Sequence, residues 1–279
     1  MDFATAKLLT IGILLGFAVL ELVCGRFWQS DKSTRRDAFI DAATTLVLPL
    51  VVLPLIYAAA PHVAELLVPG SEGWLAGMSG WAMFGILLLA DDLTQYWWHR
   101  LSHSSWLYPL HRAHHSGHYL SVRVVYRNHV VYYALMPGLW LSAILVYWGF
   151  GAVYGLYIIL KMSVIIGAHS SVPWDAPLYA RFPRLMWLVE RTISTPATHS
   201  AHHGLQESDE ATFYQGNYGN LLFFWDVLFG TARITRKRPA AFGIEKLAPV
   251  RLVDELIWFA PAVPTSAAPE RSPESTKQA

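Results

Sequence analysis

The chain has 279 residues, of which 54% are hydrophobic, 14% are aromatic and only 15% are charged. Soluble domains carry about 25% charged residues, so this balance favours a membrane protein. The formal net charge of +1 argues against a nucleic-acid partner, and the single cysteine excludes an intramolecular disulfide and a cysteine-ligated metal cluster.

The predicted elements are long apolar helices. Crossing the hydrocarbon core takes about 20 apolar residues in a helix, and candidate stretches occur at 8–25, 39–60, 80–100, 130–148 and 151–169. Pro49 and Pro54 are expected to kink the second stretch. Only "GFG" separates the last two, which predicts a tight helical hairpin. The predicted fold class is therefore all-α: a polytopic membrane helical bundle of about 4–5 spans with a cytoplasmic, histidine-rich helical cap.

The basic residues give these spans a direction. Every Lys and Arg except Lys7 and Lys161 lies on a side that the positive-inside rule makes cytoplasmic. We therefore expect the N-terminus outside, with residues 99–129 and everything after 169 inside. A soluble all-α core is the alternative, but it does not explain this sidedness. Short loops and a high alanine content favour a bacterial inner membrane.

The histidines gather on the predicted cytoplasmic face. Ten of the twelve histidines lie there, in three clusters and two single positions; His62 falls on the opposite face, and His118 has no patterned partner. Three clusters, "HRLSH", "HRAHH" and "HSAHH", place histidines three or four residues apart, where they share one helix face. Imidazole is the commonest metal ligand, and a tetrahedral zinc takes four ligands. So many imidazoles on one face predict two metal ions.

Together these motifs resemble the membrane-bound fatty acid hydroxylase / sterol desaturase superfamily. "DDLTQYWWHRLSH", "HRAHHS" and "TPATHSAHHG" resemble its three histidine boxes, and "NYGNLLFFWDVLFGT" resembles the segment after the third. The resemblance covers roughly 80–231 and implies a non-haem di-iron centre with two iron ions and O₂ as co-substrate. By motif match, the implied ligands are His99, His103, His111, His114, His115, His199, His202 and His203, with the single histidines His129 and His169 as additional ligands.

The resemblance also implies the reaction. The expected activity is hydroxylation of an unactivated C–H bond of a lipid, of the fatty acyl, sterol, aminolipid or ether-lipid type. A desaturase with the same centre is the nearest alternative. From a different class, a membrane metal-transport protein would place its ligands near mid-membrane along a path, whereas these histidines gather at one face.

Carboxylates near the boxes are candidates to orient the imidazoles. A ligating histidine usually donates its other N–H to a carboxylate or carbonyl. Asp92 lies seven residues before His99, two helical turns along one stripe. Gln95 and Asp226 are further candidates for this supporting role. The alternative for Asp92 is a helix-end carboxylate paired with a neighbouring arginine.

The remaining features concern partners and domain limits. No Cys-x-x-Cys, haem-attachment motif or Gly-rich dinucleotide fingerprint occurs, so an external electron donor is expected: a ferredoxin, a cytochrome or a reductase. Residues 179–193 alternate arginines with large apolar residues, which predicts an interfacial amphipathic helix. We expect one integral-membrane domain over 1–260, with its catalytic region at about 80–231, and a disordered tail at 261–279.

Overall fold

The computed structural model describes residues 3–247 and 250–257, so the tail expected at 261–279 lies outside the described residues. Within the described ranges all regular secondary structure is helical, which confirms the all-α prediction; one isolated bridge joins Gly204 and Phe242. In chain order the helices are α1 (Phe3–Val23), α2 (Arg35–Val47), η1 (Leu48–Val52), α3 (Leu53–Leu67), α4 (Gly80–Leu87), η2 (Leu88–Leu93), α5 (Thr94–Ser102), α6 (Tyr108–His115), η3 (Val122–Val124), α7 (Val130–Ala134), α8 (Pro137–Leu145), η4 (Val146–Phe150), α9 (Gly151–His169), α10 (Ala176–Arg181), α11 (Pro183–Thr192), α12 (Pro196–His202), α13 (Phe224–Phe229) and α14 (Leu252–Leu256).

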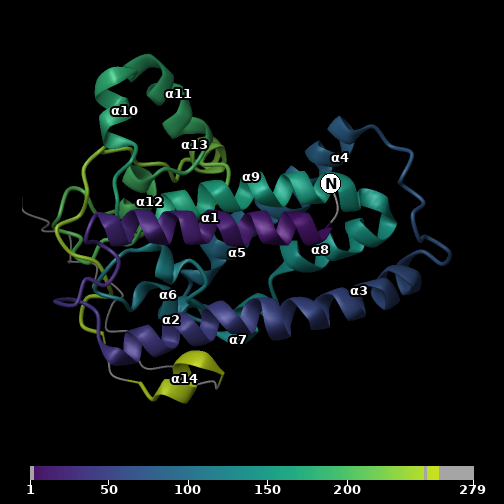
Figure 1. Cartoon of the computed structure of the whole chain (residues 1–279), viewed down its shortest axis with the longest axis horizontal. Coiled ribbons are helices and arrows are strands. Elements are labelled where there is room, and N and C mark those ends of the chain that lie inside the picture. Colours follow the sequence, from purple (N-terminus) through teal and green to yellow (C-terminus); the bar gives the residue numbers. More distant parts are fainter. Residues whose placement is uncertain (1–2, 248–249, 258–279) are drawn as a thin grey trace, which may run out of the picture.

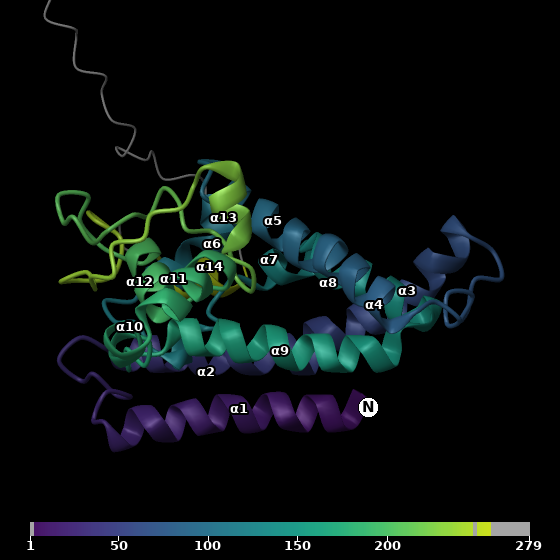
Figure 2. The ribbon, with the colours of Figure 1, turned by 90° about the horizontal axis from the view of Figure 1, so that it is seen from above.

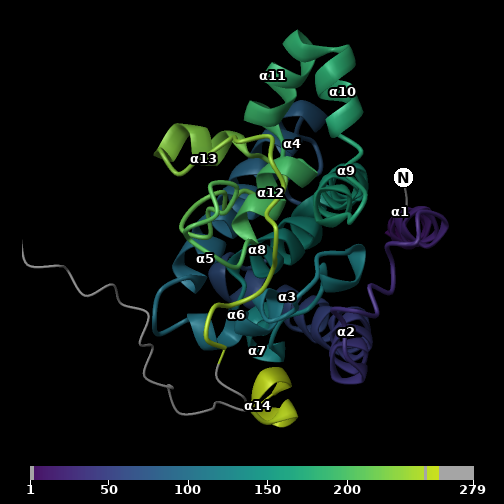
Figure 3. The same ribbon diagram turned by 90° about the vertical axis from the view of Figure 1, so that its left-hand side faces the viewer.

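The long helices run back and forth between two ends of the molecule. One end carries the N-terminus and the turn from α8 into α9, and the other carries the short helices α6 and α12 (Figure 1). Helix α1 lies alongside α9 in both this view and the view from above (Figure 2). Seen from the end that carries α6 and α12, helices α1, α2 and α9 point towards the viewer (Figure 3). The histidine-rich helices therefore gather at one end of the bundle.

Three helices among the described residues are long and apolar enough to cross a membrane: Thr5–Val23, Arg35–Leu67 and Pro137–His169. Helices α2, η1 and α3 form the second of these without a break, and its 33 residues extend for about 50 Å at 1.5 Å per residue. Along α1 the large side chains of Leu8, Ile11 and Leu15 are exposed. Exposed apolar rows of this kind mark membrane contact, so the chain is a membrane protein.

The structure differs from the expected spans at two points, and it has the turn that was expected at "GFG" between the last two. The stretch 130–148 is broken after α7, because Met136 takes an extended conformation before Pro137, which begins α8. Pro137–His169 is not straight, since Gly149 reverses the chain with a φ of 115°. A Cβ there would lie 2.8 Å from the backbone nitrogen of Ala76, so this turn requires glycine. The expected third span is continuous through α4, η2 and α5 but is not among the three apolar helices.

A buried carboxylate ties α1 to the histidine-bearing end. Glu21 accepts hydrogen bonds from the Ser121 hydroxyl at 2.6 Å and from the backbone N–H groups of Val122 and Ser171 at 3.1 and 2.7 Å. The residues that it holds flank η3 and the end of α9. The first long helix therefore fixes two segments that border the histidines.

Helices α10 and α11 project from the bundle at the same end (Figure 1). The expected amphipathic helix at 179–193 is divided, because Phe182 separates α10 from α11. Helix α11 exposes Leu185 and Trp187 and buries Met186 and Glu190. Helix α11 therefore has an exposed apolar face and a buried face, and its place at a membrane interface stays a prediction.

Candidate metal centre

Local sequence signals place the three histidine boxes on helices. The first box lies at the end of α5, with His99 in its last turn and His103 as its C-cap. The second occupies α6, whose first turn contains Pro109, and the third occupies α12, which begins with Pro196. Proline is favoured in the first turn because its missing N–H would have no helical partner. Thr195 caps α12 by accepting from the backbone N–H of Thr198 at 3.4 Å.

Nine of the ten predicted ligands form two compact groups. Within each group one ligand atom of every histidine lies within 4.8 Å of those of the others. The five-histidine group contains His99, His103, His111, His115 and His202, and the four-histidine group contains His114, His169, His199 and His203.

Each HxxHH motif contributes to both groups, in opposite ways. In α6, His111 and His115 join the five-histidine group and His114 joins the other. In the third box the pattern is reversed, since His202, at the i+3 position, alone joins the five-histidine group. Successive residues turn by about 100° around a helix axis, so i and i+4 diverge by about 40° whereas i+3 and i+4 diverge by about 100°. The two groups therefore lie between the same two helices.

Backbone carbonyls determine which nitrogen of two rings faces the group. The Nδ1 atom of His99 lies 2.7 Å from the carbonyl oxygen of Tyr218, and that of His202 lies 2.7 Å from the carbonyl oxygen of Gly216. A carbonyl only accepts, so Nδ1 carries the proton in both neutral rings. The Nε2 atoms are then left with lone pairs, the form that binds a metal.

These lone pairs face one another at ligand spacing. The Nε2 atoms of His99 and His202 are 3.0 Å apart, although neither ring has a proton left to donate between them. In the four-histidine group the Nε2 atoms of His169 and His199 are 2.9 Å apart. Two nitrogens bound at about 2.0–2.1 Å to one ion are separated by about 2.8–3.4 Å when the angle is between 90° and tetrahedral. The residues present therefore fit two histidine-bound metal ions.

Burial favours the metal-binding form of the rings outside the apolar helices. Burial lowers the pKa of these imidazoles well below the usual value, and neighbouring imidazoles lower it further. The rings are consequently neutral at pH 7, as metal binding requires. They are His111, His114, His115, His199, His202 and His203.

Asp92 holds a loop beside the site and does not bind an imidazole in the structure. Its carboxylate accepts from the Trp225 indole N–H at 2.8 Å and from the backbone N–H groups of Leu221 and Leu222. The neighbouring Asp91 forms the buried ion pair of this helix, at 2.7 Å from Lys161. Within the described residues Asp92 thus contacts the loop 216–222 and no arginine, and its role in orienting an imidazole stays a prediction.

Asp226 acts on the same loop from the other side. Its two oxygens accept from the backbone N–H groups of Tyr218 and Gly219 at 2.8 and 2.6 Å. Burial raises the pKa of the Asp226 carboxyl to about 6, against the lowering effect of these hydrogen bonds and of one from Thr231. Because the Tyr218 carbonyl accepts the His99 N–H, Asp226 contacts the residue that holds the His99 ring, and its part in a metal centre stays a prediction.

A small cavity touches both histidine groups. It has a volume of about 40 Å³, enough for a few molecules of the size of water. His111 of one group and His169 of the other contribute to its wall, together with Tyr132 and Met136. Gln95 also lines it, and the Gln95 Oε1 atom is buried with no hydrogen-bond partner within the described residues. Gln95 thus faces the cavity, and no contact with an imidazole nitrogen is seen.

His129 is buried but belongs to neither group. The backbone N–H of Val131 donates to its Nδ1 at 3.1 Å, so the side chain caps α7. Sequence reasoning missed its neighbour Asn128, whose Oδ1 lies 2.8 Å from Nδ1 of His111. In the sequence, the only feature that points to Asn128 is its position beside the single histidine of "YRNH". Carbonyl acceptors such as that of Tyr218 cannot be found from the sequence, because every residue has a carbonyl.

Comparison with known proteins gives a family and two relatives. The family model described as fatty acid hydroxylase matches residues 84–231, which contain all ten predicted ligands. Methylsterol monooxygenase 2-1 of Arabidopsis thaliana is 26% identical over 170 residues, covering 54% of this chain and 56% of the relative. Alkylglycerol monooxygenase of Danio rerio is 26% identical over 171 residues, covering 57% and 31%. The chain therefore matches less than two thirds of either relative's length. No solved structure matches it.

Proposed function

Because the chain belongs to the fatty acid hydroxylase family, we propose that it is an O₂-dependent membrane oxidoreductase that hydroxylates an unactivated C–H bond of a lipid. The observation that carries the proposal is the pair of buried histidine groups, whose Nε2 atoms face inward at the spacing of ligands on a shared ion. The two relatives are named for a sterol and an alkylglycerol. We therefore propose a sterol, fatty acyl, ether-lipid or aminolipid substrate.

The nine grouped histidines would hold two iron ions, and the role of His129 as a further ligand stays a prediction. Bound iron supplies the redox chemistry with which O₂ oxidises a C–H bond. The balanced reaction consumes R–H, O₂, two electrons and two protons and yields R–OH and water. The electrons come from an external ferredoxin, cytochrome or reductase, which would dock at the histidine-bearing end.

The chain's own contribution is to place the reacting carbon and to keep water out. The cavity is too small for a whole lipid, so we propose that it receives O₂ and the reacting C–H group. The rings of Tyr132 and Tyr133 and the side chain of Met136 form an apolar wall beside the imidazoles. Gln95 supplies an unpaired acceptor at that wall and can bind a hydroxyl group of substrate or product.

We also propose that the histidine-bearing end is cytoplasmic, with the N-terminus outside, in a bacterial inner membrane. The basic loop 24–34 and the segment 103–129 lie at that end, and the loop 61–79, which has no Lys or Arg, lies at the other. This orientation gives a soluble electron donor access to the metal centre. Protease protection in inside-out and right-side-out vesicles tests it.

The function is tested by metal analysis and lipid profiling together. The purified chain should contain two irons and consume O₂ only when substrate is present. Cells that express it should show a lipid increased by 16 mass units, absent with His202→Ala. A decrease of 2 mass units would instead identify a desaturase. Iron-independent metal uptake into vesicles, without lipid oxidation, would contradict the enzyme and favour transport.

A further inference from the structure

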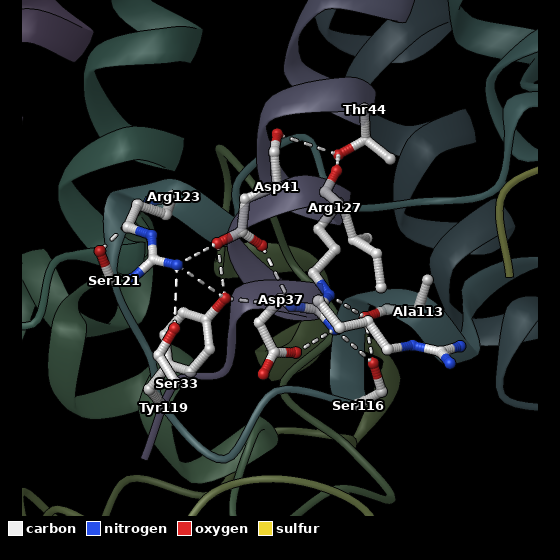
Figure 4. Close-up of polar contacts among 12 residues, drawn as sticks. Ser33, Asp37, Asp41, Thr44, Ala113, Ser116, Tyr119, Ser121, Arg123 and Arg127 are labelled. Carbon is white, nitrogen blue, oxygen red and sulfur yellow. Dashed lines mark hydrogen bonds and ion pairs between the residues drawn. The ribbon is translucent and has the colours of Figure 1, made fainter. Parts of the chain in front are cut away.

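A fully buried arginine lies behind the second histidine box. Arg127 is 1% exposed, and all five of its N–H groups have an acceptor (Figure 4). Its Nε donates to the Ala113 carbonyl at 2.8 Å, and one Nη2 hydrogen goes to the Ser116 hydroxyl at 2.8 Å. Arginine has five donors in a fixed plane, so its capacity is fully used. A side chain saturated in this way holds its partners in one arrangement.

Two of these contacts are made with the second histidine box, which contributes histidines to both groups. Ala113 lies between His111 and His114 in α6, and Ser116 directly follows His115. The Arg127 guanidinium thus binds the residues on either side of the histidine pair at 114–115. The next residue along, Asn128, accepts from the His111 ring. One short segment therefore fixes α6 through its backbone and through a ligand.

The other donors of Arg127 reach α2, the start of a membrane-spanning helix. Nη2 lies 2.8 Å from Asp37 and Nη1 lies 3.1 Å from Asp41, one turn further on (Figure 4). Nη1 also donates to the Tyr119 hydroxyl at 3.0 Å, which in turn donates to Asp41. Asp37 lies in the first turn of α2, where the helix dipole favours negative charge, and Asp41 lies in the next turn. Both carboxylates that bind Arg127 thus belong to α2 itself.

The C-terminal segment closes the network. Glu255 in α14 accepts from the Ser116 hydroxyl at 2.8 Å and pairs with Arg36 at 2.8 Å. Arg123 pairs with Asp41 at 2.8 Å. The three arginines Arg36, Arg123 and Arg127 are thereby balanced by Asp37, Asp41 and Glu255. All three carboxylates lie outside residues 84–231, the part that matches the family model.

We propose that Arg127 is a positioning residue for the metal centre: through Ala113 and Ser116 it sets the orientation of the second histidine box, using carboxylates from the segments that flank the family region. The inference rests on the proposed function, because it requires that the box binds metal. Removal of a group that supports ligands typically weakens metal affinity by about 10- to 100-fold. Lysine at this position keeps the charge but has three donors for five acceptors.

The test uses the full chain in detergent with Co²⁺ as the metal probe. The variants are Arg127→Lys and Ser116→Ala; the latter keeps every charge of the network. Arg236→Lys is the matched control, because Arg236 binds the buried Glu190 at 2.6 and 2.9 Å and makes no contact with α6. The measurements are cobalt per chain, affinity from competition with a chelator, the cobalt absorption spectrum, and thermal unfolding of the metal-free chain.

We expect Arg127→Lys to weaken cobalt binding by about 10-fold or more and to change the absorption spectrum, with Ser116→Ala acting in the same direction. Arg236→Lys should lower thermal stability while leaving affinity and spectrum unchanged. If Arg127→Lys does not fold, the affinity of Ser116→Ala decides. Wild-type affinity and spectrum in the variants that fold would overturn the positioning role. A wild-type chain that takes up no cobalt would overturn the metal centre itself, and this inference with it.

Discussion

The five-histidine group and the four-histidine group share two helices but are held differently. In the first, the Nδ1 atoms of His99, His111 and His202 each lie within 2.8 Å of an oxygen acceptor. In the second, His169 has such an acceptor, the Ile165 carbonyl at 2.7 Å.

The rings of His114 and His199, also in the four-histidine group, have Nδ1 atoms that are buried without a hydrogen-bond partner among the described residues. Acceptors on Nδ1 fix the tautomer and ring orientation and raise ligand basicity. The difference teaches that the fold by itself orients the rings of one candidate metal position, whereas the rings of the other would depend more on a bound metal for their orientation.

The largest effect should come from removing one ligand from each group on the same helix. His202→Ala and His199→Ala delete single rings of α12 from the five- and four-histidine groups respectively. Each variant is expected to keep about one of the two irons and to lose lipid oxidation, because an open ligand position lowers affinity and both ions serve one reaction. Iron content by mass spectrometry and product analysis check this. Two irons in either variant would refute the grouping.

A smaller effect is expected when an acceptor is removed and the ligand stays. Asn128→Ala leaves Nδ1 of His111 without its oxygen partner and should weaken metal binding in the five-histidine group by about 10-fold. Asn128→Asp keeps an oxygen there and should restore most of the affinity. Chelator competition measures both. Equal affinities of the alanine and aspartate variants would show that the contact does not orient the ring.

The comparison also predicts the order in which metal leaves. With excess chelator the iron of the four-histidine group should be released first, because fewer of its rings are held in place without metal. Release should therefore be biphasic, and the fast phase should be missing in His199→Ala. A single phase in the wild-type chain, or loss of the slow phase in His199→Ala, would contradict the proposed difference.

The metal-free chain should lose stability on acidification. Burial lowers the pKa of the six imidazoles of the second and third boxes, whereas the same rings in the unfolded chain take up protons below about pH 6.5. The unfolded state then binds more protons, so stability falls as the pH drops below about 6.5. Bound metal should raise stability at each pH but should not reduce this fall, because the unfolded chain still takes up the same protons. Thermal unfolding between pH 7 and 5 measures it, and an unchanged melting temperature of the metal-free chain would be the contrary result.

The smallest effect is expected at the cavity wall. Gln95→Leu removes an unpaired acceptor that lies beside both groups without contacting a ring nitrogen. Metal content should be unchanged, while turnover falls by a few-fold, the equivalent of one hydrogen bond of about 0.5–1.5 kcal/mol. Steady-state kinetics on the identified lipid gives the value. Loss of iron in this variant would show that Gln95 supports the metal ligands and does not act on the substrate.

Much of this architecture was predictable because its signals are local in the sequence. The spacing of "HRAHH" and "HSAHH" predicts rings on one helix face, and Pro109 and Pro196 indicate where those helices begin. The distribution of Lys and Arg predicts the end of the bundle at which they gather. The break before Pro137 was less visible, because a long apolar run hides a change of helix.

The supporting contacts were predicted less well. The expectation that Asp92 and Asp226 orient imidazoles identified the right region, but both carboxylates bind the loop that carries the acceptor carbonyls. The positions of backbone carbonyls depend on how a loop folds, and the identities of the side chains do not predict them. Likewise, Arg127 looks like one more cytoplasmic basic residue until its five partners are seen together.

The sequence by itself determined the helical class, the first two long apolar helices and the two HxxHH helices, because each depends on the periodicity of a short segment. Only the tertiary structure decided how the histidines divide. His114 and His202 leave the partners of their own motifs and join rings from other segments. That division follows from the packing of α5, α6, α9 and α12 against one another. The angle between positions i+3 and i+4 directs their two rings into different groups only because another helix lies on each side.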